Sequence, residues 1–264
     1  MDRFGRCFGN HLMRSAILTA LVLLCACSVK EDRAPCPCLM MLDIICPDKA
    51  KAETAELYVT SDDGFLWTDI VDLTRTRYSV QVPRAGLHVK AWTGTEGLAS
   101  EHGLVIPEGR DCPKVYMHDS DLRVEGEFFE AEAVMRKNHC VMTLVTLGEG
   151  RINADLRLKG NVAGYDAYGN PLPGDFGFLL DDGGLSEGYV AVLPRQTDAS
   201  LTLVIDDRNG NSREFALGRY IVSSGYDWTA PDLEDVTVTL DYALTEIRLV
   251  IGGWESVYRY DVEI

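Results

Sequence analysis

The sequence has 264 residues, of which 41 are acidic and 25 are basic, and its formal net charge is −16. Such an acidic surface repels nucleic acid and anionic lipid headgroups, so nucleic-acid binding is excluded. Hydrophobic residues make up 46% of the chain, which is enough apolar material for packed cores and excludes a disordered stalk.

The first 26 residues have the pattern of a secretory signal. An apolar run of 11 residues, AILTALVLLCA at 16–26, follows three basic residues, Arg3, Arg6 and Arg14. A helix of that length rises roughly 16 Å, about half of a bilayer's hydrocarbon core, so it is too short to span. Positive residues followed by a short apolar region are typical of an export signal, with Met1 or Met13 as its start.

Cys27 is the expected site of covalent lipid attachment. Leu24-Cys25-Ala26-Cys27 resembles the bacterial lipobox, with Leu three residues before the modified cysteine and a small residue just before it. Cys25 fits less well, because Leu24 stands where a small residue is needed. We expect diacylglycerol and an N-acyl chain on Cys27, cleavage after residue 26, and a mature chain of 238 residues with a net charge of −18. The alternative is an ordinary signal with an incidental cysteine.

The residues after the modified cysteine indicate the destination. Ser28 stands where an Asp is typical of retention in the inner membrane. Lys30, Glu31 and Asp32 resemble the Lys-acidic-acidic signal that sends lipoproteins of Bacteroidetes-type bacteria to the outer leaflet. We therefore predict an outer-membrane lipoprotein exposed at the cell surface on a tether of residues 27–35. The alternative is that the charges only keep the tether solvated.

From residue 36 onward the sequence predicts β-strands almost throughout. The runs are short, rich in Val, Ile, Tyr and Thr, and divided by turn residues, which is typical of antiparallel sandwiches. The Asp207–Gly210 turn contains Asn-Gly, a strong hairpin signal. The expected strands are Leu39–Cys46, Glu56–Thr60, Phe65–Val71, Arg77–Val82, Leu87–Trp92, Lys114–His118, Leu122–Glu125, Val134–Leu147, Ile152–Leu158, Tyr189–Leu193, Leu201–Ile205, Arg213–Leu217, Val236–Tyr242, Glu246–Ile251 and Ser256–Val262.

Two segments depart from this pattern. Gly94–Gly109 is expected to form a longer connection. Glu127–Met135 (EFFEAEAVM) is the one helical candidate, and it marks a domain junction that we place near residue 130. The prediction is therefore an all-β fold of two tandem β-sandwich domains, residues 36–130 and 131–264.

The sequence predicts a protein that is not an enzyme and has neither a metal nor another cofactor. Gly-x-Ser-x-Gly, a Gly-rich phosphate loop and a histidine pair with metal spacing are all absent from the sequence. Asp181–Gly184 is more typical of a turn than of paired catalytic carboxylates. Asp207, Asn209 and Asn211 begin like a calcium loop, but Gly218 stands where such a loop needs Glu. No small-molecule substrate is expected.

Five cysteines remain in the mature chain outside the lipobox, an odd number for an oxidising compartment. At most two disulfides fit, and the sequence leaves their pairing open. A zinc site is not supported, because neither paired spacing nor a partner histidine is present. These cysteines are Cys36, Cys38, Cys46, Cys112 and Cys140.

Four motifs follow one another along the mature chain: CSVKEDRAPCPCLMMLDI at 27–44, GNVAGYDAYGNPLPG at 160–174, VLPRQTDASLTLVI at 192–205 and IRLVIGGWESVYRYDVEI at 247–264. Their order and spacing resemble the FimB/Mfa2 family, the anchor subunits of type V fimbriae of Bacteroidales. The resemblance covers nearly the whole mature chain. It implies transthyretin-like Greek-key sandwiches and a non-enzymatic role at the base of a fimbria, held by lipid and bound to the neighbouring shaft subunit.

The resemblance also implies assembly by strand addition, in which a foreign strand pairs with an exposed sheet edge. The expected contact strand is the C-terminal segment, although an ordinary edge strand of its own domain is an open alternative. Its contact residues would be Trp254, Val257, Tyr258, Tyr260, Val262 and Ile264. Two other functions stay open: a surface glycan-binding lipoprotein, with Tyr165 and Tyr168 stacking on sugars, and a tip or accessory subunit of the same fimbriae.

Overall fold

A computed structural model describes the chain from Cys36 to Arg259 with short gaps. The described residues are 36–47, 50, 52–75, 77–147, 154–180, 188–207, 210, 212–241 and 246–259. The predicted signal, the predicted lipidation site Cys27 and the predicted export residues Ser28, Lys30, Glu31 and Asp32 lie outside them, as do Asp181–Gly184, Tyr260, Val262 and Ile264. All the strands belong to one compact unit, residues 38–264, which is described by itself.

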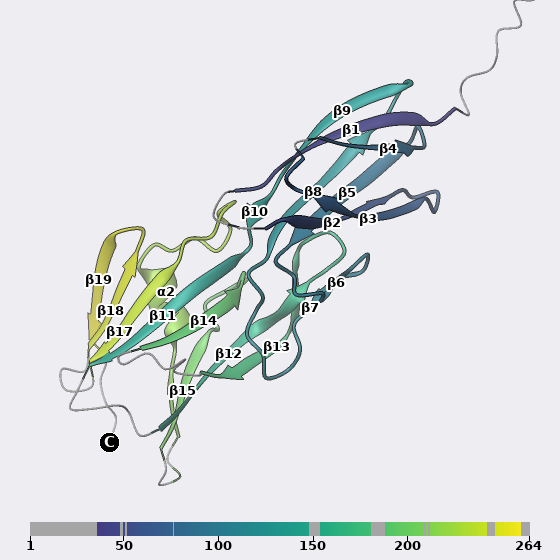
Figure 1. The fold of residues 1–264 in the computed structure, drawn as a ribbon. Coiled ribbons are helices and arrows are strands. Elements are labelled where there is room, and N and C mark those ends of the chain that lie inside the picture. Colours follow the sequence, from purple (N-terminus) through teal and green to yellow (C-terminus); the bar gives the residue numbers. More distant parts are fainter. Residues whose placement is uncertain are drawn as a thin grey trace, which may run out of the picture. The chain divides into compact units, whose positions relative to one another are not determined.

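The first hydrophobic core lies between two sheets (Figure 1). In one sheet a central strand pairs antiparallel with one neighbour and parallel with the other, in the order β4-β1-β9. The facing sheet has the order β10-β8-β5-β2-β3. The strands are β1 (Cys38–Ile45), β2 (Thr54–Thr60), β3 (Leu66–Asp72), β4 (Arg77–Val82), β5 (Gly86–Thr93), β8 (Tyr116–Arg123), β9 (Phe128–Val134) and β10 (Arg136–Lys137).

The expected helix at Glu127–Met135 is wrong, because this segment forms β9. Its Ala and Glu residues favour a helix, but its side chains also alternate with a period of two. Phe129 and Ala131 pack against the first core and Ala133 is fully buried in it, whereas Phe128 on the opposite face is 54% exposed. Pairing with the central strand β1 supplies backbone hydrogen bonds along one side of the segment from Phe128 to Val134, and together with the burial of Ala133 it outweighs the local helix propensity.

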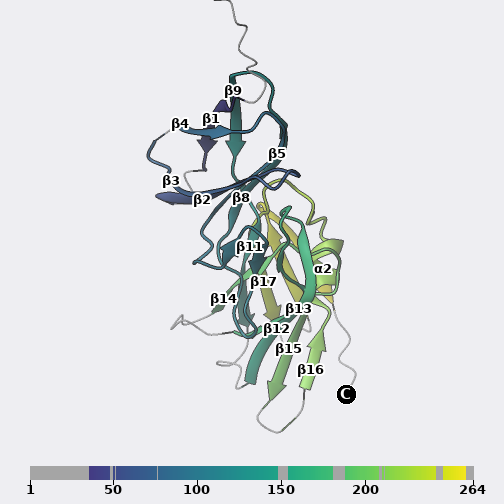
Figure 2. The ribbon, with the colours of Figure 1, turned by 90° about the vertical axis from the view of Figure 1, so that its right-hand side faces the viewer.

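The second core also lies between two sheets (Figure 2). One has the order β14-β11-β17-β18-β19; the other has the order β16-β15-β12-β7-β6, with β13 paired to β12. The strands are β6 (Ala99–Ser100), β7 (Gly103–Val105), β11 (His139–Leu147), β12 (Ala154–Tyr165), β13 (Pro171–Leu179), β14 (Gly188–Pro194), β15 (Thr202–Asp207), β16 (Ser212–Phe215), β17 (Val236–Asp241), β18 (Glu246–Ile251) and β19 (Trp254–Arg259). The all-β prediction with two sandwiches is confirmed.

The alternation in β17 is confirmed, since Val236, Val238 and Leu240 are at most 2% exposed. The Asn-Gly hairpin is confirmed by the antiparallel pairing of β15 with β16. Four details differ from the prediction. The strand expected at Val134–Leu147 is divided into the end of β9, β10 and β11. The two strands expected between residues 114 and 125 are the single β8, the strand expected at Arg213–Leu217 ends at Phe215 before a short helix α2 (Leu217–Ser223), and β13 was not predicted.

The predicted connection at Gly94–Gly109 is wrong in part, because it contains the small hairpin β6–β7. This hairpin pairs with the end of β12 and so adds residues from the first half of the sequence to a sheet of the second core. The backbones approach so closely that a Cβ on Gly164 would lie 2.0 Å from the Leu104 carbonyl oxygen. Only glycine fits there, and its φ of +148° is also one that other residues avoid. The boundary placed near residue 130 stays a prediction.

The second core also extends to side chains of the first sandwich's β5 sheet. Trp92 of β5 and Tyr165 of β12, both fully buried in this core, have ring centroids 6.1 Å apart. The Tyr165 hydroxyl donates to the Asn138 carbonyl and accepts from the Arg195 backbone N–H at 3.0 Å. The Arg195 guanidinium in turn donates to the Asn138 side chain and to carbonyls of the 228–231 loop, so Tyr165, Asn138 and Arg195 form one hydrogen-bonded network.

All five described cysteines are free thiols, so none of the disulfides that the sequence left room for joins them. Cys38, Cys112 and Cys140 are buried and pack as small apolar residues. Burial raises the pKa of Cys140 to about 12, which keeps its thiol protonated and unreactive at neutral pH.

Candidate functional site

The predicted contact strand forms β19, at the edge of a sheet of the second core. Among the described strands it pairs with β18 alone, antiparallel from Trp254 opposite Ile251 to Arg259 opposite Glu246. Its other side therefore presents backbone N–H and C=O groups that a further strand could pair with.

The side chains of β19 show which groups a partner would meet. Tyr258 faces inward, packs against the second core and lies 5.4 Å from the Tyr220 ring of α2. Val257 faces the opposite side and is 49% exposed. Trp254 at the start of the strand is 83% exposed, which is unusual for so large an apolar side chain. The strand thus offers solvent two apolar side chains beside its unpaired edge.

Two ion pairs hold β19 against β18. Arg248 Nε lies 3.0 Å from Glu255 Oε1, and Arg259 Nε lies 3.2 Å from Glu246 Oε1. Three of these four side chains are about half exposed or more, so each pair contributes at most about 1 kcal/mol. Their main effect is to fix the register, because Arg248 is opposite Val257 and diagonal to Glu255. The edge is therefore presented in one defined arrangement.

A second exposed edge, which the sequence did not single out, is β3 in the first sandwich. Its apolar side chains Ile70, Leu66 and Trp67 are 71%, 52% and 41% exposed. The Trp67 indole donates to the Tyr78 hydroxyl at 3.0 Å, so the edge is ordered by its neighbour β4. The sequence did carry one signal of an exposed apolar edge: Phe65–Val71 is rich in apolar residues but lacks the alternation of a half-buried strand.

The tyrosines proposed to stack on sugars have different surroundings. Tyr165 is fully buried and belongs to the core, so it is not available to a ligand. Tyr168, three residues later in the β12–β13 turn, is 63% exposed. In the described part of the chain, no group of three or more His, Cys, Asp or Glu is placed to hold a metal ion, and no helix is long and apolar enough to cross a membrane.

No protein-family model matches the sequence, and no curated protein matches it at a significant level. Solved structures do match. The fimbrial anchor protein Mfa2 from Porphyromonas gingivalis aligns over 85% of this chain and 100% of its own, with a TM-score of 0.62 and 12% identity. A candidate adhesin from Bacteroides thetaiotaomicron aligns over 85% and 99%, with a TM-score of 0.58 and 17% identity.

A candidate polysaccharide-binding protein, also from Bacteroides thetaiotaomicron, aligns over 86% of this chain and 99% of its own, with a TM-score of 0.61 and 12% identity. These alignments take in both sandwiches, so the likeness concerns the whole described architecture. At identities this low, the structural likeness establishes a shared fold but does not transfer the function of one protein to another. The predicted resemblance is confirmed at the level of the fold, which this chain shares with a fimbrial anchor of Bacteroidales.

Proposed function

We propose that this protein is a non-enzymatic outer-membrane lipoprotein that anchors a type V-like fimbria to the cell surface. The observation that carries the proposal is the combination of a lipobox with a fold shared, end to end, with a fimbrial anchor protein. The fimbrial shaft subunit is the proposed partner, and lipid on Cys27 is the proposed link to the membrane. The export residues Ser28, Lys30, Glu31 and Asp32 would place the domains outside the cell.

The proposed contact is strand addition at β19. A partner strand would satisfy the free backbone groups of this edge, and its side chains would cover Trp254 and Val257. Backbone pairing supplies affinity and the two apolar side chains supply the burial that makes the contact specific. The predicted contact residues Tyr260, Val262 and Ile264 lie outside the described residues, and their role remains part of the proposal.

Changing Val257 to lysine is expected to weaken binding of the shaft subunit roughly tenfold. A charge on an edge strand opposes the addition of a further strand, because pairing would bury it. Since the side chain is half exposed, the free energy of unfolding should change by no more than about 0.5 kcal/mol. Pull-down of the shaft subunit by the detergent-solubilised protein measures the loss.

The matched control is Val190→Lys on β14, which forms the opposite edge of the same sheet and is 43% exposed. It introduces the same charge at a similar exposure and should leave shaft binding unchanged. Equal losses in both variants, or full binding by the Val257 variant, would show that β19 is an ordinary edge strand.

A further inference from the structure

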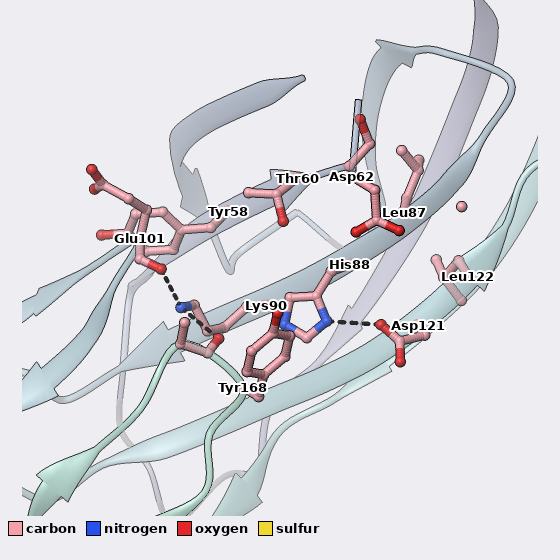
Figure 3. Close-up of a pocket in the computed structure, with 13 residues that line it drawn as sticks. Tyr58, Thr60, Asp62, Leu87, His88, Lys90, Glu101, Asp121, Leu122 and Tyr168 are labelled. Atoms are coloured by element: carbon pink, nitrogen blue, oxygen red, sulfur yellow. Dashed lines mark hydrogen bonds and ion pairs between the residues drawn. The ribbon is translucent and has the colours of Figure 1, made fainter. Parts of the chain in front are cut away.

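A cavity of about 510 Å³ lies where the exposed face of the β5 sheet meets the β6–β7 and β12–β13 turns. Its size falls within the range of small-ligand sites. Figure 3 shows Tyr58 and Thr60 of β2, His88 and Lys90 of β5, and Tyr168 of the β12–β13 turn around it. The proposed anchoring function uses none of these residues.

Lys90 sets the floor of the cavity. Its side chain is 1% exposed, and its ammonium donates to the Glu101 carbonyl at 3.0 Å and the Ala167 carbonyl at 2.9 Å. The same ammonium lies about 5.5 Å from the ring centroids of Tyr58 and Trp92, within cation–π range. The buried Lys90 ammonium therefore fixes both turns against β5. The cavity lies between these ordered turns and the sheet.

Tyr168 forms one wall and is presented by a rigid turn. The Asp166 carboxylate accepts from the backbone N–H groups of Tyr168 at 2.8 Å and Asn170 at 2.9 Å. The exposed Tyr168 ring meets the His88 ring edge-on at 5.0 Å. His88 is itself held between two carboxylates, with Nδ1 2.9 Å from Asp121 and Nε2 3.0 Å from Asp119. The Tyr168 ring is thus held in a fixed orientation at the wall of the cavity.

The remaining walls carry hydrogen-bonding groups that stay open to solvent. Asp62 and Asp121 are exposed to solvent. The Asp121 carboxylate contacts His88 through one oxygen, so its second oxygen can still accept hydrogen bonds from a ligand. Thr60 and Ser61 add hydroxyls that both donate and accept. The cavity therefore pairs one exposed ring face with several acceptors spread around it.

We propose that this cavity binds a neutral sugar unit, with one apolar face of the pyranose on Tyr168 and its hydroxyls donating to Asp62 and Asp121. A sugar ring has C–H groups on its faces and O–H groups around its rim, which matches a tyrosine face bordered by carboxylates. Acidic sugars are excluded by the repulsion of Asp62, Glu101 and Asp121. This proposal goes beyond anchoring and does not depend on it.

The test is saturation-transfer NMR on the intact ectodomain with the methyl glycosides of glucose, galactose, mannose and N-acetylglucosamine. At least one should bind saturably, with little dependence on salt because it is uncharged. Methyl glucuronide is the acidic comparison and should not bind. Tyr168→Ala should weaken binding roughly fivefold or more, since it removes the stacking face. Asp62→Ala should also weaken it.

Matched controls separate the cavity from the general surface. Phe128→Ala removes another exposed aromatic ring, and Asp63→Ala removes the carboxylate next to Asp62 that does not line the cavity. Both should bind sugar as the wild type does, and Tyr168→Ala should keep full binding of the shaft subunit, so the two proposals fail separately. The sugar site would be overturned if no glycoside binds saturably, if Tyr168→Ala binds normally, or if arginine methyl ester binds in a salt-sensitive manner while sugars do not.

Discussion

A chain in which Cys27 is replaced by serine is expected to be lost almost completely from the outer membrane. The substitution removes the sulfur that would carry diacylglycerol and blocks the cleavage that frees the amino group for the third acyl chain, so the apolar run at 16–26 stays attached and holds the chain at the inner membrane. Even one acyl chain gives only marginal membrane binding, with an association constant of about 10⁴ M⁻¹, and here all would be lost. Immunoblots of separated outer-membrane, inner-membrane and soluble fractions measure the change, and intact-mass analysis of the wild type should show the added lipid.

Cys25→Ser is the matched control for this experiment. It makes the same chemical change two residues earlier, in the segment that we expect to be removed with the signal. That variant should stay in the outer-membrane fraction with the lipid mass intact. An unmodified thiol at Cys27 in the wild type, or an equal loss of both variants from the outer membrane, would contradict lipid anchoring through this residue.

The free energy of unfolding is expected to fall by about 2 kcal/mol between about pH 7.5 and about pH 5 because of His139 alone. The ring is 2% exposed, its Nδ1 lies 3.0 Å from the Val115 carbonyl oxygen, and burial lowers its pKa to about 4. In the unfolded chain the pKa is about 6.5. As the pH falls below that value, the unfolded state binds the proton first and gains stability, until the folded ring also titrates near its own pKa.

Urea unfolding of the wild type and of His139→Gln at the two pH values measures this contribution. His118, whose pKa is also lowered by burial, adds a change of the same sign in both proteins, so the difference between them isolates His139. His102→Gln is the control, because it makes the same substitution at a histidine whose side chain is 88% exposed. An unchanged pH dependence in His139→Gln would show that the ring is not buried in its neutral form.

The sequence predicted most strands well because burying one face of a sheet imposes a period of two on the chain. This is clear in β17, where Val236, Val238 and Leu240 alternate with threonines. The prediction failed where pairing over long range decides the conformation. The segment Glu127–Met135 has helix-forming residues but lies beside β1, and the short hairpin β6–β7 exists because Gly103 and Gly164 allow two backbones to meet.

The candidate sites also differ in how far the sequence could predict them. The C-terminal segment was singled out through the resemblance, whereas the edge position of β19 and the exposure of Trp254 required the structure. The cavity could not be predicted, because Lys90, Glu101 and Ala167 are brought together only by the contact between distant turns. One signal did exist: Tyr168 sits in a turn set by Asp166 and Gly169, where a large aromatic side chain has no core to fill.

The most direct test of the anchoring role is the position of this protein on isolated fimbriae. Fibres sheared from cells carrying an epitope-tagged chain would be labelled with antibody and gold and examined by electron microscopy. Anchoring predicts one cluster of label, confined to the end of the fibre that carries membrane fragments. Label at the free tip would assign the chain to a tip subunit, and its absence from purified fibres would contradict a fimbrial role altogether.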